Sequence, residues 1–386
     1  MKIAFKFLAV SVIVLVVISI LPSCGSTYLS RWIFWNFSDI EDYQKFPYRD
    51  VSNASPIFNF APVSVPQVNT ISYQYKGKNH QKTVVDFVNQ TETTALIVIK
   101  NDSLLYEGYG SGYARSSINT SFSIAKSITS MLVGIAISEG KIKGTRGAIT
   151  DYIPELLASD EQIKEVSISN LLMMQSGFYY RDHDLVWGDK PKNYYHPCLR
   201  QRALNVKLDE PPGERWQYMG YNPIICGMIL ERTTNQTVTK YFEDKLWTKI
   251  GAEFPASWSI DSEEGQMEKM ESGVNGRAID FAKLGRLMLL DGSWEGRQII
   301  SKEWVADCTS LDGSVEAWKG VHYKNFWWLY PSDDKHPQSY AATGHLGQFI
   351  FVSPEEKVVI VRFGKEMGKV DSWINIFREI ATRVSE

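Results

Sequence analysis

The 386-residue chain has only four cysteines, no strong excess of either charge and no repeated or low-complexity stretch. With so few cysteines, a disulfide framework is not what holds the fold together, whereas 44% hydrophobic residues suffice for a large core. A net charge of −3 argues against nucleic acid as the main partner. The sequence also lacks an H-x-x-x-H or C-x-x-C pattern, so it predicts neither a metal site nor a cofactor.

Aromatic residues, in contrast, are abundant: the chain has 12 Trp, 19 Tyr and 18 Phe. Most aromatic side chains in folded proteins belong to the core, and that interpretation needs no ligand. The alternative is that some of them line a pocket for an apolar or ring-bearing ligand.

The chain begins with a feature of exported proteins. Lys2 and Lys6 precede an apolar run over residues 7–21, which fits a secretory signal and is short for a membrane-spanning helix. Residues 21–24 read Leu-Pro-Ser-Cys, which resembles the lipobox of bacterial lipoproteins and predicts lipidation of Cys24. The alternative is an uncleaved N-terminal helix that crosses the membrane. Both interpretations anchor the protein in a membrane and place its bulk outside the cytoplasm, on the periplasmic side.

The rest of the chain divides into two parts. Residues 25–84 form an aromatic-rich extension with no helical period, which we expect to be extended and to pack on the main domain through its aromatic side chains. Residues 85–386 are expected to form the main domain, with a mostly helical lobe at about 145–310.

The order of elements in the main domain predicts an α+β fold. Two strand-like runs flank the turn residues 100–102, which predicts a β-hairpin. Apolar residues then recur at helical spacing over 124–136, which predicts a helix capped by Thr120 or Ser121 and ended by Gly140. After the helical middle, the chain returns to strands and a final helix, so the sheet is built from both ends of the sequence.

Ser123 and Lys126 stand three residues apart in Ser-Ile-Ala-Lys, at the start of the predicted helix. Residues i and i+3 share a helix face, so the amine reaches the serine oxygen. Burial lowers the pKa of a lysine, and the helix dipole and unpaired first-turn amides favour negative charge on that oxygen. A serine is inert at its own pKa, and this arrangement turns it into a nucleophile. The alternative is an ordinary helix start with a solvated lysine.

The same Ser-x-x-Lys spacing occurs at Ser138 and Lys141 and at Ser332 and Lys335. The first pair ends a helix beside Gly140, and the second lies in a hydrophilic loop. Because neither offers a desolvated first helical turn, both are interpreted as chance matches.

Two further elements carry related chemistry. Tyr218 follows a Pro-Gly turn, where a tyrosine at a loop tip transfers a proton between nucleophile and leaving group, although a core tyrosine is the commoner outcome. Gly344 and Gly347 flank the start of a strand, where a substrate can lie against bare backbone; a bulge or tight turn is the alternative. His345 between them has no neighbouring carboxylate to orient its ring, so its backbone amide is the better candidate.

These elements, in this order, resemble the serine β-lactamase and penicillin-binding-protein superfamily, in particular its class C-like branch of esterases and 6-aminohexanoate-dimer hydrolase-like enzymes. The similar segments are SFSIAKSITSMLVGIAISEGKI, ISNLLMMQSG, PGERWQYMGYN, VNGRAIDFAKLGRLMLLDGSWEGRQIIS and TGHLGQFIFVSPE. The resemblance covers about residues 85–386. It implies a β-lactamase-like α+β fold, with an antiparallel sheet flanked by helices and a mostly helical lobe.

The resemblance also implies a serine hydrolase that cleaves an ester or amide through an acyl-enzyme on Ser123. Lys126 would activate the serine, and Tyr218 would act as general base and acid. The backbone amides of Ser123 and His345 would form the oxyanion hole. The expected partner is a small-molecule or short peptide-like ester or amide.

Substrate-binding residues follow from the same resemblance. Thr343 and Gly344 would flank the substrate at the strand. Further polar residues near the pocket assist amide cleavage in that branch, and Tyr180, Asp182 and Asp184 lie in a suitable place. A solvated polar loop is an equally good interpretation of these three residues.

Two positions depart from the family pattern. The family's Tyr-x-Asn reads Tyr218-Met219-Gly220 here, so a side-chain amide that often contacts substrate is missing. Ala342 stands where many members have a Lys or His that assists recognition of a carboxylate, which argues against an efficient β-lactamase or carboxypeptidase. The alternative functions are a D-alanyl peptidase or penicillin-binding protein acting on cell-wall peptide, and a non-catalytic ligand-binding module of the same fold.

Overall fold

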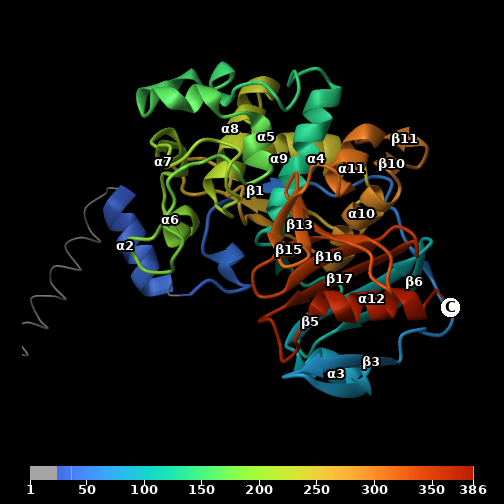
Figure 1. Ribbon diagram of the computed structural model, residues 1–386. Coiled ribbons are helices and arrows are strands. Elements are labelled where there is room, and N and C mark those ends of the chain that lie inside the picture. Colours follow the sequence, from blue (N-terminus) through green and yellow to red (C-terminus); the bar gives the residue numbers. More distant parts are fainter. Residues whose placement is uncertain (1–23, 36, 386) are drawn as a thin grey trace, which may run out of the picture.

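A nine-stranded sheet lies in the lower part of Figure 1, and most of the helices gather above it. The computed structural model describes residues 24–35 and 37–385, so the predicted signal segment, residues 1–23, lies outside the described residues. In spatial order the strands of this sheet are β12 (Val315–Trp318), β13 (Val321–Lys324), β14 (Trp327–Tyr330), β15 (Ser339–Gly344), β16 (Gln348–Ser353), β17 (Val358–Gly364), β5 (Thr93–Lys100), β6 (Ser103–Tyr109) and β2 (Ala61–Pro62).

A second sheet of four short strands has the order β1 (Tyr48–Val51), β8 (Ala256–Ser259), β9 (Val274–Gly276) and β7 (Asn119–Thr120). Two separate hairpins are formed by β3 (Thr70–Tyr75) with β4 (Lys78–Thr83) and by β10 (Ser293–Trp294) with β11 (Arg297–Gln298). The α-helices are α2 (Cys24–Trp35), α3 (Val84–Gln90), α4 (Ile124–Ser138), α5 (Ile168–Leu172), α6 (Asp189–Tyr195), α7 (Leu199–Leu204), α8 (Tyr221–Thr234), α9 (Val238–Phe242), α10 (Ala278–Leu289), α11 (Lys302–Thr309) and α12 (Trp373–Arg383). The predicted α+β fold class is confirmed.

The large sheet is buried on both faces. Along β5, Ala95, Ile97 and Ile99 belong to one hydrophobic cluster, and Leu96 and Val98 belong to another. Because side chains of a strand alternate between faces, a strand covered on both sides needs an unbroken apolar run. Helices α4 and α10 contribute to the first cluster, and α3 and α12 contribute to the second.

The predicted hairpin is present, since β5 pairs antiparallel with β6 and Lys100 lies opposite Ser103. Asn101 and Asp102 have φ angles of 47° and 63°. Asn and Asp tolerate this left-handed conformation better than most residues, which explains why they occupy a two-residue hairpin loop.

The helix predicted after the hairpin is α4, but its predicted cap is wrong. Ser123 itself is the N-cap, and its side chain makes no capping hydrogen bond. Thr120 lies in β7 instead, where its hydroxyl donates to the carbonyl oxygen of Ile40 at 3.0 Å. Gly140 follows the helix with a φ of 71°, as a helix-ending glycine should.

The aromatic extension contains a helix, contrary to expectation. Residues 24–35 form α2, which lies beside α6 in Figure 1. The expected aromatic packing is present, because Tyr28 and Phe46 form a buried cluster with Tyr195 of α6. A short apolar stripe was too weak a sign of this helix in the sequence, and contact with the main domain stabilises it.

A disulfide joins Cys24 to Cys198, with 6.0 Å between their Cα atoms, whereas Cys226 and Cys308 are buried free thiols. A thioether to lipid and this disulfide would compete for one sulfur atom. Lipidation of Cys24 therefore stays a prediction, and the disulfide argues against it. Within the described ranges, no helix is both long enough and apolar enough to span a membrane.

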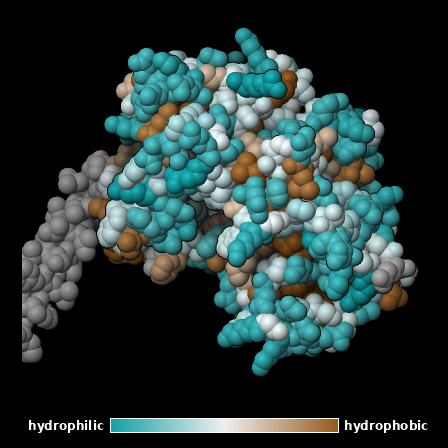
Figure 2. All heavy atoms as spheres, viewed as in Figure 1, coloured by the Kyte–Doolittle hydropathy of each residue, from teal (hydrophilic) through white to brown (hydrophobic). Residues whose placement is uncertain are grey.

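The exposed face seen in Figure 2 is mostly hydrophilic, with hydrophobic residues in small separate groups. The interior, in contrast, contains charges. Asp280 and Lys283 of α10 are fully buried, with 2.9 Å between Oδ1 and Nζ. The Asp280 carboxylate also accepts hydrogen bonds from the amides of Glu253 and Phe254. Burial raises the pKa of Asp280 and lowers that of Lys283, so each charge depends on the other.

We expect Asp280→Ala to lower the free energy of unfolding by about 3–5 kcal/mol, because it leaves the Lys283 charge buried without its partner. Urea denaturation measures the change. Glu161→Ala is the matched control, since Glu161 pairs with Lys164 at the same i,i+3 spacing but on the exposed surface. That control should cost less than about 1 kcal/mol. Equal effects of the two substitutions would contradict the prediction.

Candidate active site

The start of α4 is held by the small sheet. Strand β7 pairs with β9, and the amide of Ser121 donates to the carbonyl oxygen of Val274 at 2.9 Å. All residues from 119 to 136 are buried except Ser123, which is partly exposed. The serine is therefore the single point at which this stretch of chain is open to a small molecule.

The residue before the serine has an unusual backbone conformation. Phe122 has a φ of 46°, in the left-handed region that a bulky residue rarely adopts. Its ring packs edge-on against the ring of His345, with 5.5 Å between centroids, and lies 6.3 Å from the ring of Tyr194. Strain of this kind persists where the surrounding structure fixes it, and it occurs preferentially at functional sites.

Lys126 lies against the serine. Its Nζ is 2.9 Å from Ser123 Oγ and donates to the carbonyl oxygen of Glu271 at 3.0 Å. The lysine is only 3% exposed. In this water-poor position, the amine and the hydroxyl are close enough for direct proton transfer.

Tyr218 completes the group. The Nζ of Lys126 lies 4.8 Å from the centroid of the Tyr218 ring, which is half-buried in the loop before α8. The tyrosine ring packs among Trp216, Tyr323 and Trp328, with centroid distances of 5.8 to 6.1 Å. The structure therefore brings together the three residues that the sequence singled out for catalysis. Part of the abundant aromatic content forms a wall beside them.

The end of β15 lies alongside the serine turn. A Cβ at Gly344 would lie 2.3 Å from the carbonyl oxygen of Ser121, so only glycine permits this approach. Within residues 24–35 and 37–385, the backbone amides of Ser123 and His345 donate no hydrogen bond. The carbonyl oxygen of His345 accepts a hydrogen bond from Gln348 Nε2 at 2.9 Å, which holds the turn. Thr343 is the partly buried residue that precedes Gly344 on the same strand.

The three polar residues considered for substrate binding, Tyr180, Asp182 and Asp184, differ in their exposure to solvent. Tyr180 is partly buried against the core, with its ring 5.8 Å from that of Tyr221, and burial raises the pKa of its hydroxyl well above the usual value. Asp182 and Asp184 are exposed, and Asp184 pairs with Lys190 at 3.0 Å. A role for Tyr180 or Asp182 in substrate binding stays a prediction. For the two aspartates, the structure matches the solvated-loop interpretation.

The sequence did not single out the Lys269–Glu271 pair, which lies next to Lys126. Glu271 Oε1 accepts a hydrogen bond from Lys269 Nζ at 3.2 Å, and its backbone oxygen binds Lys126. Burial lowers the pKa of Lys269. Because Lys126 is held through a main-chain oxygen, no side-chain pattern could have revealed the contact.

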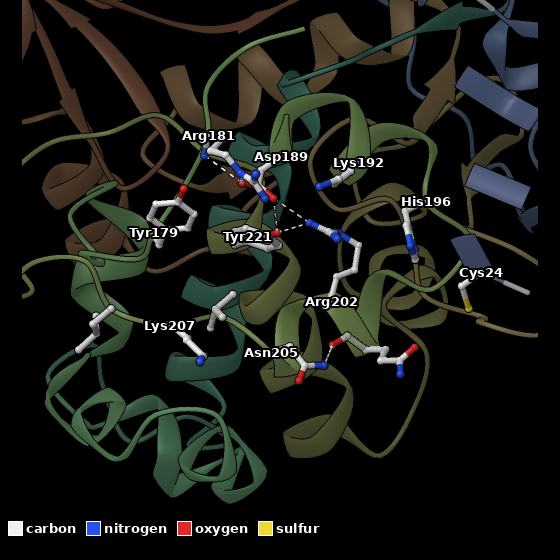
Figure 3. Close-up of a pocket in the computed structure, with 13 residues that line it drawn as sticks. Cys24, Tyr179, Arg181, Asp189, Lys192, His196, Arg202, Asn205, Lys207 and Tyr221 are labelled. Carbon is white, nitrogen blue, oxygen red and sulfur yellow. Dashed lines mark hydrogen bonds and ion pairs between the residues drawn. The ribbon is translucent and has the colours of Figure 1, made fainter. Parts of the chain in front are cut away.

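A cavity of about 540 Å³ lies elsewhere, among α6, α7, the start of α8 and residues 179–181 (Figure 3). Neither Ser123, Lys126 nor Tyr218 lines it. Asp189, which lines this cavity, accepts hydrogen bonds from Arg202 Nη2 at 2.8 Å and from the Tyr221 hydroxyl at 3.0 Å (Figure 3). Asp189, Arg202 and Tyr221 are thus paired with each other. Among the described residues, no group of three or more His, Cys, Asp or Glu is placed to hold a metal ion.

A nine-stranded sheet, a helical lobe and a buried helix with a Ser-x-x-Lys start together define a class of proteins. Comparison of the chain with known protein families identifies this class. The family model described as Beta-lactamase matches residues 81–381, so the chain belongs to the β-lactamase family. The 6-aminohexanoate-dimer hydrolase of Paenarthrobacter ureafaciens is 25% identical over 305 residues, which are 74% of each chain.

Solved structures agree on the fold. A protein of Bacillus anthracis assigned as a 6-aminohexanoate-dimer hydrolase is similar with a TM-score of 0.76 and 21% identity, over 92% of this chain and 94% of that one. A class C β-lactamase is similar with a TM-score of 0.57 and 14% identity, over 77% of this chain and 91% of that one. The predicted family resemblance is confirmed.

Proposed function

We propose that the protein is a serine hydrolase that cleaves an ester or amide through an acyl-enzyme on Ser123. The observation that carries this proposal is the 2.9 Å distance between Ser123 Oγ and the Nζ of the buried Lys126. The similarity to a hydrolase of a linear amide, the 6-aminohexanoate dimer, supports the same conclusion.

In the proposed reaction, the Ser123 oxygen attacks the substrate carbonyl while its proton passes to the Lys126–Tyr218 pair. The amides of Ser123 and His345 stabilise the oxyanion that develops on the carbonyl oxygen. Tyr218 then gives a proton to the departing alcohol or amine, and the carbonyl–oxygen or carbonyl–nitrogen bond breaks. Water then attacks the acyl-enzyme and loses a proton to the same pair. The pair returns this proton to the Ser123 oxygen as the bond to the acyl group breaks, which releases a carboxylic acid and restores the serine.

The site itself narrows the substrate class. The position where a lysine would recognise a carboxylate is Ala342, whose side chain is apolar and buried. We therefore propose an ester or linear amide whose binding needs no lysine at this position, rather than a β-lactam or a carboxypeptidase substrate. A D-alanyl peptidase or penicillin-binding protein is the alternative enzyme, and a non-catalytic ligand-binding module of the same fold is the alternative from a different class.

We also propose that the protein acts outside the cytoplasm, on the periplasmic side of a membrane. The basic start and apolar run of residues 1–21 support export, and so does the Cys24–Cys198 disulfide, because disulfides persist in oxidising compartments. The membrane anchor is either a lipid on Cys24 or an uncleaved N-terminal helix. Mass spectrometry of the mature N-terminus, before and after reduction, distinguishes a lipid from a disulfide at Cys24.

The mechanism is tested by treating the protein with a fluorophosphonate probe and locating the adduct by mass spectrometry. We expect one adduct, on Ser123. Penicillin should leave that serine free, whereas a D-alanyl peptidase would be acylated. A screen of short acyl esters, linear amides and a chromogenic cephalosporin should show turnover of the first two classes. If neither probe labels the protein and no ester or amide is hydrolysed, the binding module is the better explanation.

Gly344→Ala should reduce kcat/KM for ester hydrolysis about 100-fold, because its methyl group would displace β15 from the serine turn and misplace the His345 amide. The fold should survive, as thermal unfolding will show. Gly147→Ala is the control, since a Cβ there meets only Asp151 Oδ2 at 3.9 Å. Unchanged activity of Gly344→Ala would exclude His345 from the oxyanion hole.

A further inference from the structure

Gly220 has an ordinary helical backbone, with φ −83° and ψ −23°, at the N-cap of α8. Any residue adopts this conformation, so the glycine is not required by its backbone. What it does provide is space. A Cβ at this position would lie 2.7 Å from Nδ2 and 3.2 Å from Cγ of Asn193, a residue of α6. The Asn193 side chain therefore fills the volume above Gly220, two residues after Tyr218.

Asn193 is only 2% exposed, yet neither Nδ2 nor Oδ1 has a hydrogen-bond partner. Among the buried side chains of the described residues, it is the only one that has both an unpaired donor and an unpaired acceptor. Burying an amide unpaired is costly, and native structures rarely do so without a reason. A leucine would fill the same volume at no such cost.

The residue that follows Asn193 lies near the serine turn. The next residue, Tyr194, lies with its ring 6.3 Å from that of Phe122. The carbonyl oxygen of Tyr194 accepts a hydrogen bond from Lys269, which pairs with Glu271, whose backbone oxygen binds Lys126. The Asn193 side chain thus packs on Gly220 at the end of the Tyr218 loop, and its neighbour in sequence, Tyr194, lies near the serine turn.

We propose that Asn193 recognises a second amide group of the substrate, next to the bond that is cleaved. A carboxamide side chain offers one donor and one acceptor that match the carbonyl oxygen and the N–H of a secondary amide. This inference rests on the proposed function and narrows its substrate class to chains that carry an additional amide on the acyl side. Asn193 is then a specificity-determining residue that reaches the site from α6.

Two esters of equal length test this assignment: p-nitrophenyl N-acetylglycinate, which has the second amide, and p-nitrophenyl pentanoate, which lacks it. We expect the wild type to prefer the first. Asn193→Leu should lower kcat/KM for the amide-bearing ester about 10- to 100-fold and change kcat/KM for the pentanoate less than about threefold. Asn205→Leu, at an exposed asparagine, is the matched control and should change neither value.

If Asn193→Leu folds poorly, a double variant that moves the side-chain amide from position 193 to position 220 provides a second test. Asn193→Gly removes the amide together with the Cβ that would lie 3.0 Å from a Cβ at position 220, and so makes room for Gly220→Asn. The double variant should recover most of the preference that Asn193→Gly loses. Equal losses for both esters, or no loss, would overturn the role of Asn193 while the hydrolase function stands. If wild type hydrolyses neither ester and no probe labels Ser123, the proposed function fails and the assignment of Asn193 fails with it.

Discussion

Ser123→Ala is expected to abolish fluorophosphonate labelling and to lower kcat/KM for ester hydrolysis about a million-fold, to the rate that binding and the oxyanion hole alone sustain. The hydroxyl oxygen is the atom that would carry the acyl group, and among the described residues it is the only hydroxyl with a hydrogen bond to Lys126 Nζ. Labelling by the probe and steady-state kinetics measure the two effects.

The chain contains a matched control for this substitution. Ser138 stands on the same helix and is also followed three residues later by a lysine, but it is exposed, and its hydroxyl donates to the carbonyl oxygen of Ile135. Ser138→Ala should keep full activity and labelling. If Ser123→Ala retained either property, the nucleophile would have to be another residue.

Lys126→Met should lower kcat/KM by about 10²- to 10⁴-fold, the usual contribution of a positioned acid or base. Methionine keeps the length and apolar stem of the lysine, so the loss reports on the amine rather than on packing. The variant loses both hydrogen bonds of Nζ, to Ser123 and to the Glu271 carbonyl, and its Ser123 should react with the fluorophosphonate correspondingly more slowly.

Lys141→Met provides the comparison, because Lys141 has the same spacing from Ser138 and is exposed to water. It should behave like the wild type. Activity of Lys126→Met within tenfold of the wild type would show that another group removes the proton from the serine.

The elements that the sequence predicted well are those defined by local patterns. The period of apolar residues identified α4, and the turn at Asn101 and Asp102 identified the β5–β6 hairpin. The Ser-x-x-Lys spacing became a contact because residues three apart in a helix share a face. Tyr218 was found from its loop, although its distance from Lys126 depends on packing that no local pattern contains.

What the sequence could not predict depends on contacts between distant parts of the chain. The segment 145–310, expected to be a helical lobe, also contains the strands β8 and β9. These strands are too short to show a recognisable alternation of apolar and polar residues. Glu271 acts through its backbone oxygen, which every residue has. The side chain of Asn193 fills the space that a side chain at Gly220 would occupy. Because the two residues lie on different helices, only the three-dimensional structure reveals this contact.

The pairing of β7 with β9 has a consequence for how this protein can be divided. The turn that contains Ser123 follows β7, and β7 pairs with β9, which lies about 150 residues further along the chain. Most of the helical lobe comes between these two strands in the sequence. The helical lobe therefore cannot be deleted without affecting the active site. A shortened protein with only the large sheet and its flanking helices would lose the β7–β9 hydrogen bonds that position the Ser123 hydroxyl. During synthesis, the active site therefore cannot form until the chain has been translated as far as residue 276, the end of β9.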